Sequence, residues 1–140
     1  MTMKDRVEKA VELFKSGYNC SQSVVAAFAD MYGFTQEQAL RMSASFGGGI
    51  GRMRQTCGAA CGMFLLAGLE KGVVDGKDRE GKAANYALVQ QLAEEFRKRN
   101  GSMICAELLG LKKPEGSSTP EARTEQYYAK RPCAKMVEEA

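Results

Sequence analysis

The residues of this chain with the most distinctive chemistry are its five cysteines, Cys20, Cys57, Cys61, Cys105 and Cys133. The 140 residues include no histidine, so the usual proton shuttle near neutral pH and the commonest metal ligand are both missing. Redox chemistry or soft-metal binding would therefore depend on sulfur. The ordinary alternative is that each cysteine is a small hydrophobic residue in the core.

Four of the cysteines share a predicted position, the first turn of a helix. Each follows a residue typical of helix starts: Asn19 before Cys20, Thr56 before Cys57, Ser102 three residues before Cys105, and Pro132 before Cys133. Unpaired backbone N–H groups and the positive end of the helix dipole favour an anion there, and a thiolate is such an anion. The placement predicts sulfurs with a lowered pKa that react or bind a metal.

Cys61 differs from the other four. It lies four residues after Cys57, on the same side of the same predicted helix. A direct bond between two such thiols is poorly matched to disulfide geometry. We therefore predict that Cys61 is a small buried hydrophobic residue.

The residues after Cys57 give one helix face almost no side-chain bulk. Gly58, Ala59 and Gly62 lie on that face, and an interior glycine costs about 1 kcal/mol relative to alanine. Close approach of a neighbouring helix that carries Cys20 or Cys105 would offset this cost.

The glycine-rich residues 47–51 precede this segment, and they interrupt helix because glycine permits a positive φ. A phosphate-cradling loop is one interpretation, but neither nucleotide-binding glycine motif is present. Arg52 and Arg54 follow directly. They could stabilise a thiolate at Cys57 or an anionic cofactor, or they could simply be solvated.

The elements that must position the thiols are helices, since hydrophobic residues recur nearly everywhere at three- and four-residue spacing. Asn19 caps a predicted helix that ends at Gly33, and Thr35 with Gln38 is typical of a capping box. A first predicted helix carries Val7, Ala10, Val11 and Phe14 and stops at Gly17. The further predicted helices cover residues 19–33, 35–46, 57–71, 78–99, 102–109 and 133–139. The sequence thus predicts an all-α domain over residues 1–140, a compact bundle of five to seven helices.

The polar residues 111–131 are the most loop-like part. Pro120 in Thr119-Pro120-Glu121 still favours a helix start. Tyr127 and Tyr128 are predicted to tether this long connection to the core.

The composition gives no sign of a nucleic-acid-binding, membrane-spanning or secreted protein. The chain is 44% hydrophobic and 26% charged, with a net charge of +3, which is ordinary for a globular domain and gives no reason to expect nucleic-acid binding. The longest apolar run, residues 63–69, is too short to span a bilayer, and no signal-peptide pattern is present. We expect a cytoplasmic protein, where disulfides are transient or catalytic and where five cysteines do not form a static framework.

The order of the cysteines, with Gly58, Ala59 and Gly62 after Cys57, resembles the C-GCAxxG-C-C family of redox-active proteins over essentially the whole chain. The resemblance implies that Cys20, Cys57, Cys105 and Cys133 are the family cysteines and that Cys61 falls on a variable position. Some relatives are labelled selenoproteins, which implies a reactive sulfur or selenium. A weaker similarity is to the cysteine-bearing part of split-Soret cytochromes, where an iron–sulfur centre is implied.

Two functions follow as hypotheses. The first is thiol–disulfide or electron-transfer chemistry, with Cys57 as the nucleophile, Cys20 as the resolving thiol, and a redox partner protein or a small disulfide or oxidant as the partner. The second is binding of an iron–sulfur cluster or zinc by Cys20, Cys57, Cys105 and Cys133. A non-catalytic helical domain that binds a partner, with the cysteines in its core, is the third interpretation. The Gly58/Gly62 face could pack within the chain or in a homo-oligomer.

Overall fold

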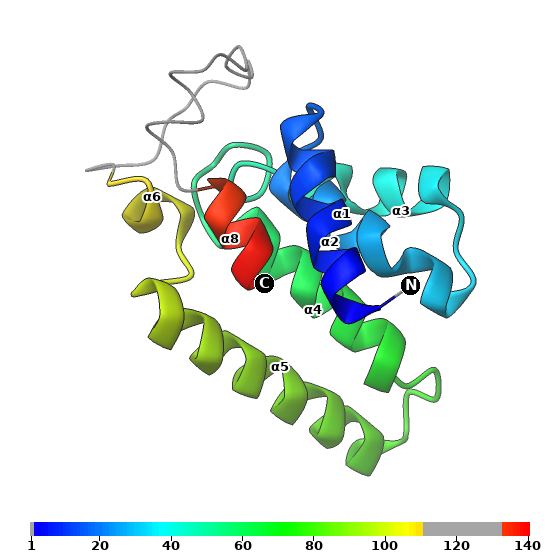
Figure 1. Ribbon diagram of the computed structural model, residues 1–140. Helices are drawn as coiled ribbons and strands as arrows, with labels where there is room; N and C mark the ends of the chain where they lie inside the picture. Colours follow the sequence, from blue (N-terminus) through cyan, green and yellow to red (C-terminus); the bar gives the residue numbers. More distant parts are fainter. Residues whose placement is uncertain (1, 111–132) are drawn as a thin grey trace.

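A computed structural model describes residues 2–110 and 133–140 (Figure 1). These residues form seven α-helices and no strand, so the all-α prediction is confirmed. The α-helices are α1 (Met3–Lys15), α2 (Cys20–Phe28), α3 (Gln36–Ser43), α4 (Gly58–Lys71), α5 (Arg79–Asn100), α6 (Cys105–Leu108) and α8 (Cys133–Glu139), and the short 3-10 helices are η1 (Ala29–Tyr32) and η2 (Ala44–Phe46). The predicted helix start at Thr119 and the predicted tether at Tyr127 and Tyr128 lie outside the described residues.

Predicted caps set the starts of α2 and α3. The side chain of Asn19 accepts a hydrogen bond from the Gln22 N–H at 2.9 Å, and the Gln22 side chain accepts one from the Asn19 N–H at 3.1 Å. Thr35 and Gln38 make the same reciprocal pair. Both helices end in 3-10 turns, η1 and η2, where the sequence predicts continuous helix.

Two predicted helix starts are wrong. α4 begins at Gly58 with Cys57 as its N-cap, and α6 begins at Cys105 rather than near Ser102. The reason is a short antiparallel bridge between Thr56 and Ile104. The N–H of Cys57 donates to the Met103 carbonyl at 2.7 Å, and the N–H of Cys105 donates to Gln55 at 2.6 Å. This backbone is extended, so neither helix can begin earlier.

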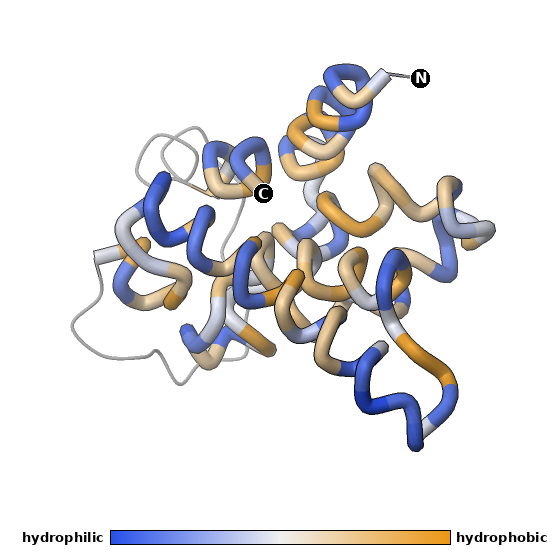
Figure 2. Tube along the Cα trace, turned by 90° about the horizontal axis from the view of Figure 1, so that it is seen from below, coloured by the Kyte–Doolittle hydropathy of each residue, from blue (hydrophilic) through white to orange (hydrophobic). Residues whose placement is uncertain are grey.

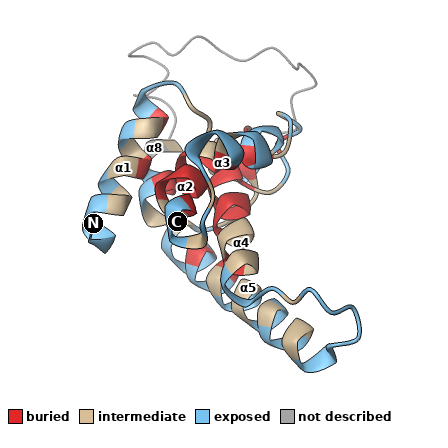
Figure 3. Cartoon of the chain, turned by 90° about the vertical axis from the view of Figure 1, so that its right-hand side faces the viewer, coloured by how far each residue is buried: buried red, intermediate tan, exposed pale blue. Residues whose placement is uncertain are grey.

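The core lies around α2, which packs against α1, α3 and α4. Figure 3 shows buried residues concentrated on α2 and on the adjoining part of α4. Figure 2 shows hydrophobic segments gathered where the helices meet and hydrophilic segments on the outer turns. Cys20, Cys57 and Cys105, at the starts of α2, α4 and α6, are buried in this part of the molecule.

The long helix α5 is anchored at its C-terminal half, where Ala93 and Phe96 are buried. Its first half carries no buried residue and extends away from the other helices (Figure 3). No helix among the described residues is both long enough and apolar enough to cross a membrane.

Candidate thiol site

Four cysteines from distant parts of the chain converge at one end of the bundle. Cys20, Cys105 and Cys133 are the first residues of α2, α6 and α8, and Cys57 is the N-cap of α4. Cys20 is hydrogen-bonded to Cys133 and interacts electrostatically with Cys57 and Cys105. Cys57 interacts in turn with Cys105 and Cys133. The structure thus brings together the four cysteines that the sequence separated from Cys61.

The glycine face of α4 allows the approach of α2. A Cβ atom at Gly58 would lie 2.9 Å from the carbonyl oxygen of Phe46 and 3.3 Å from the Cβ of Cys20. A Cβ atom at Gly62 would lie 3.0 Å from the Cβ of Val24. The prediction that a helix carrying Cys20 packs on this face is confirmed, and it explains why these positions hold glycine.

The glycine-rich loop folds as a left-handed turn. Residues 48–52 all have φ between 56° and 74°, although two of them, Ile50 and Arg52, are not glycine. Each such residue costs roughly 1–2 kcal/mol of strain. A Cβ atom at Gly49 would lie 2.5 Å from that of Cys105, so only glycine lets the loop pass so close to this thiol.

The same geometry argues against the phosphate-loop interpretation. The N–H groups of residues 50–55 donate to carbonyl groups of residues 45–50. A phosphate loop needs such N–H groups turned outward to a ligand. Here they hold the loop together instead.

Arg54 is buried, with 4% of its surface exposed. Its guanidinium donates a hydrogen bond to the Cys105 sulfur at 3.6 Å. Of the roles left open for this arginine, surface solvation is wrong, because the side chain is buried and donates to a thiol, that of Cys105. A guanidinium charge beside sulfur favours the thiolate form.

The expectation of a lowered pKa at the helix starts is wrong for Cys20 and Cys57. Burial raises the pKa of Cys57 to about 12, although the N–H groups of Ala60 and Ala59 act in the opposite direction. The hydrogen bond to Cys133 and burial raise the pKa of Cys20 well above its usual value. Loss of water outweighs the helix start here, because a buried thiolate is poorly solvated.

Cys61 lies one helical turn after Cys57 on α4 and is buried. Its sulfur donates to the carbonyl oxygen of Thr56 at 3.8 Å, and burial raises its pKa. These contacts agree with the predicted packing role.

The metal-binding alternative can be tested against the same geometry. Within residues 2–110 and 133–140, no three histidine, cysteine, aspartate or glutamate side chains are placed to hold one metal ion. The side chains as placed therefore do not fit a zinc site of three or four protein ligands.

A family model described as "Putative redox-active protein (C_GCAxxG_C_C)" matches residues 18–140. The chain belongs to this family. No curated protein and no solved structure matches it. Membership in the C_GCAxxG_C_C family confirms the resemblance drawn from the sequence and supports redox activity as the class of function, without naming a reaction.

The family name writes Gly-Cys-Ala, whereas this chain reads Cys57-Gly58-Ala59 and carries a second cysteine at Cys61. The structure distinguishes the two, because only Cys57 interacts with the other three thiols. We therefore equate Cys57 with the family cysteine of this motif.

The sequence interpretation missed the bond from Arg54 to Cys105 and the approach of Gly49 to the same thiol. Both contacts join segments about fifty residues apart. Local periodicity and capping patterns carry no signal for such contacts.

Proposed function

We propose that this protein carries out thiol–disulfide exchange, with Cys133 as the attacking sulfur and Cys20 as the resolving thiol. The observation that supports this most directly is the hydrogen bond between Cys20 and Cys133 within the group of four thiols. Two thiols in contact are candidates to form a disulfide.

Accessibility favours Cys133 over Cys57 as the first sulfur to react. Cys133 is half-buried, whereas Cys20, Cys57 and Cys105 are buried. The contact with Cys133 and burial raise the pKa of Cys20, so Cys20 keeps its proton and suits the later, resolving step. Cys57, with a pKa of about 12, is protonated at neutral pH and is a poor first nucleophile.

The proposed reaction proceeds in two exchange steps. The Cys133 thiolate attacks one sulfur of a substrate disulfide, forms a mixed disulfide and releases the other half as a thiolate. The Cys20 sulfur then attacks the Cys133 sulfur, and the Cys20 proton leaves with the second half as a thiol. Two protein thiols are oxidised to one disulfide, and one substrate disulfide is reduced to two thiols.

Cys57 and Cys105 provide a second pair in this proposal. The bridge between Thr56 and Ile104 holds their backbones side by side, and Arg54 stabilises a thiolate on Cys105. Exchange with the Cys20–Cys133 disulfide would return Cys20 and Cys133 to thiols and join the buried Cys57 and Cys105 in a disulfide. The reaction needs a small disulfide or a partner protein, and it suits the cytoplasm, where thiols are regenerated by reduction.

Anaerobic purification, metal analysis and thiol counting on one sample test the proposal. We expect metal-free protein with five free thiols, which loses two of them on limited oxidation by a small disulfide. Mass mapping should find the bond between Cys20 and Cys133. Cys133→Ser should abolish fast oxidation, and Cys61→Ser should leave it unchanged.

Stoichiometric iron or zinc that protects the thiols would contradict the proposal and support the cofactor alternative. Equal oxidation rates for the Cys133→Ser variant and the unmodified protein would also exclude the assigned roles.

A further inference from the structure

A cavity of about 470 Å³ opens between the C-terminal end of α5, α6 and α8. Figure 1 shows these three segments around one corner of the molecule. Its lining includes Arg99, Ser102, Glu107, Leu108, Lys135 and Met136. Nothing in the exchange reaction above uses them.

The floor of this cavity adjoins the thiol site. Leu108 lies three residues after Cys105, and Met136 lies three residues after Cys133, so each shares a helix face with a thiol one turn away. One turn of helix is about 5 Å. Leu108 and Met136 also belong to the same apolar cluster as Cys20. Cys133 does not itself line the cavity, so a molecule held against Met136 lies about one helical turn from this half-buried thiol.

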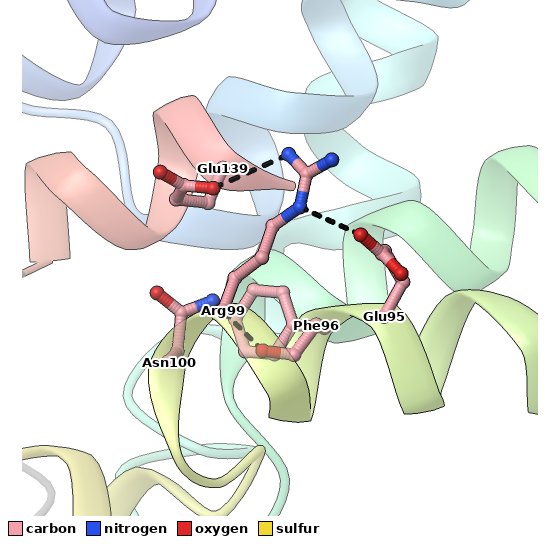
Figure 4. Close-up of polar contacts among 5 residues, drawn as sticks. All are labelled: Glu95, Phe96, Arg99, Asn100 and Glu139. Carbon is pink, nitrogen blue, oxygen red and sulfur yellow. Dashed lines mark hydrogen bonds and ion pairs between the residues drawn. The ribbon is translucent and has the colours of Figure 1, made fainter.

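The rim of the cavity carries both positively and negatively charged side chains. Arg99 is held by Glu95 at 3.0 Å and by Glu139 at 3.4 Å (Figure 4). These carboxylates raise the pKa of Arg99, so it stays a cation. Lys135 adds a second cation on an exposed side chain.

The opposite charge comes from Glu107, which accepts a hydrogen bond from the Ser102 hydroxyl. A carboxylate can therefore pair with Lys135 while an ammonium group pairs with Glu107. The volume is in the range of small-ligand sites and is too small for a folded partner.

We propose that this cavity binds a small disulfide with amino-acid-type head groups, which carry a carboxylate and an ammonium group, and presents its sulfur to Cys133. This inference rests on the proposed function and adds the class of substrate. Lys135 holds the carboxylate, Glu107 holds the ammonium group, and Leu108 and Met136 contact the carbon chain.

Two disulfides of different charge test this assignment, glutathione disulfide and the neutral bis(2-hydroxyethyl) disulfide. The rate of oxidation of the reduced protein is measured for each as its concentration is varied. We expect Lys135→Gln and Glu107→Gln each to raise the half-saturating concentration of glutathione disulfide about three- to fivefold. The neutral disulfide should react at an unchanged rate. Lys98→Gln is the matched control, because Lys98 is exposed on α5 and does not line the cavity.

Equilibrium binding separates this inference from the proposed function. The Cys133→Ser variant should still bind glutathione disulfide, and adding Lys135→Gln should weaken that binding by the same factor. Binding without any oxidation of the unmodified protein would support the cavity and refute the exchange reaction. Equal effects of Lys135→Gln on both disulfides, or no binding by Cys133→Ser, would overturn the assignment of the cavity.

Discussion

The guanidinium of Arg54 donates to the sulfur of Cys105, 51 residues further along the chain, at 3.6 Å. Arg54 has φ 60° and is buried, so the left-handed loop carries its strain while it holds a positive charge beside a thiol. Strain of this kind persists only where surrounding contacts fix it, and it is common at functional sites. The arrangement links the glycine-rich loop to the four-thiol site.

Removal of this guanidinium should affect both stability and thiol reactivity. We expect Arg54→Gln to lower the free energy of unfolding by about 2 kcal/mol, because a buried charge-assisted hydrogen bond is lost. Alkylation of Cys105 should slow by about tenfold, since its thiolate loses the cation. Denaturant unfolding and mass-mapped alkylation measure the two effects.

Arg41→Gln is the control for this experiment, because Arg41 is exposed and pairs with the exposed Glu37. It should change stability by less than about 0.5 kcal/mol. An alkylation rate of Cys105 that is unchanged in Arg54→Gln would show that the contact does not activate the thiol.

Two glycines of α4 should respond oppositely to alanine. Gly62→Ala places a Cβ atom 3.0 Å from Val24 and 3.1 Å from the Ser21 carbonyl, so we expect a loss of about 1–3 kcal/mol as α2 is displaced. Gly68→Ala meets nothing within 4 Å and should stabilise the helix by about 0.5–1 kcal/mol. Thermal or denaturant unfolding of both variants checks the signs. A neutral Gly62→Ala would mean that α2 and α4 do not depend on this close approach.

The stability of the reduced protein should fall in alkali. Burial raises the pKa of Cys57 from 9.0 to about 12 in the folded protein. Between these values the unfolded chain has lost a proton that the folded chain retains. The stability linked to this thiol is therefore complete below about pH 9 and is lost as the pH rises toward 12.

Unfolding free energies of the reduced protein at several pH values above about 8 test this dependence. Each unit of pH should cost up to about 1.4 kcal/mol for this thiol in the sensitive range. Cys57→Ser should therefore lose stability less steeply than the unmodified protein. Parallel profiles for the two proteins would show that Cys57 titrates alike in the folded and unfolded states.

Added zinc should not stabilise the reduced protein. No three ligand-type side chains in the described parts of the chain are placed around one ion, so binding would require rearrangement of the buried thiols. We expect the Tm to change by less than about 2 °C with one equivalent of zinc. A large rise in Tm, lost in Cys20→Ser but kept in Cys61→Ser, would instead identify a zinc site at the four thiols.

Short-range patterns determined much of the fold. The capping pairs of Asn19 with Gln22 and of Thr35 with Gln38 act over three residues, so the sequence alone located the starts of α2 and α3. The spacing of Gly58 and Gly62 likewise predicted a close-packed face. Each of these features depends on residues within one or two helical turns.

Tertiary structure alone decided the chemistry of the thiols. The bridge between Thr56 and Ile104 moved two helix starts, and the packing of the glycine-rich loop brought the guanidinium of Arg54 to Cys105. The sequence identified which four cysteines belong together and the dipole that favours their thiolates. The contact with Cys133 together with burial reversed the expected pKa shift of Cys20, and burial reversed that of Cys57, because both effects depend on how segments far apart in the chain pack around each sulfur.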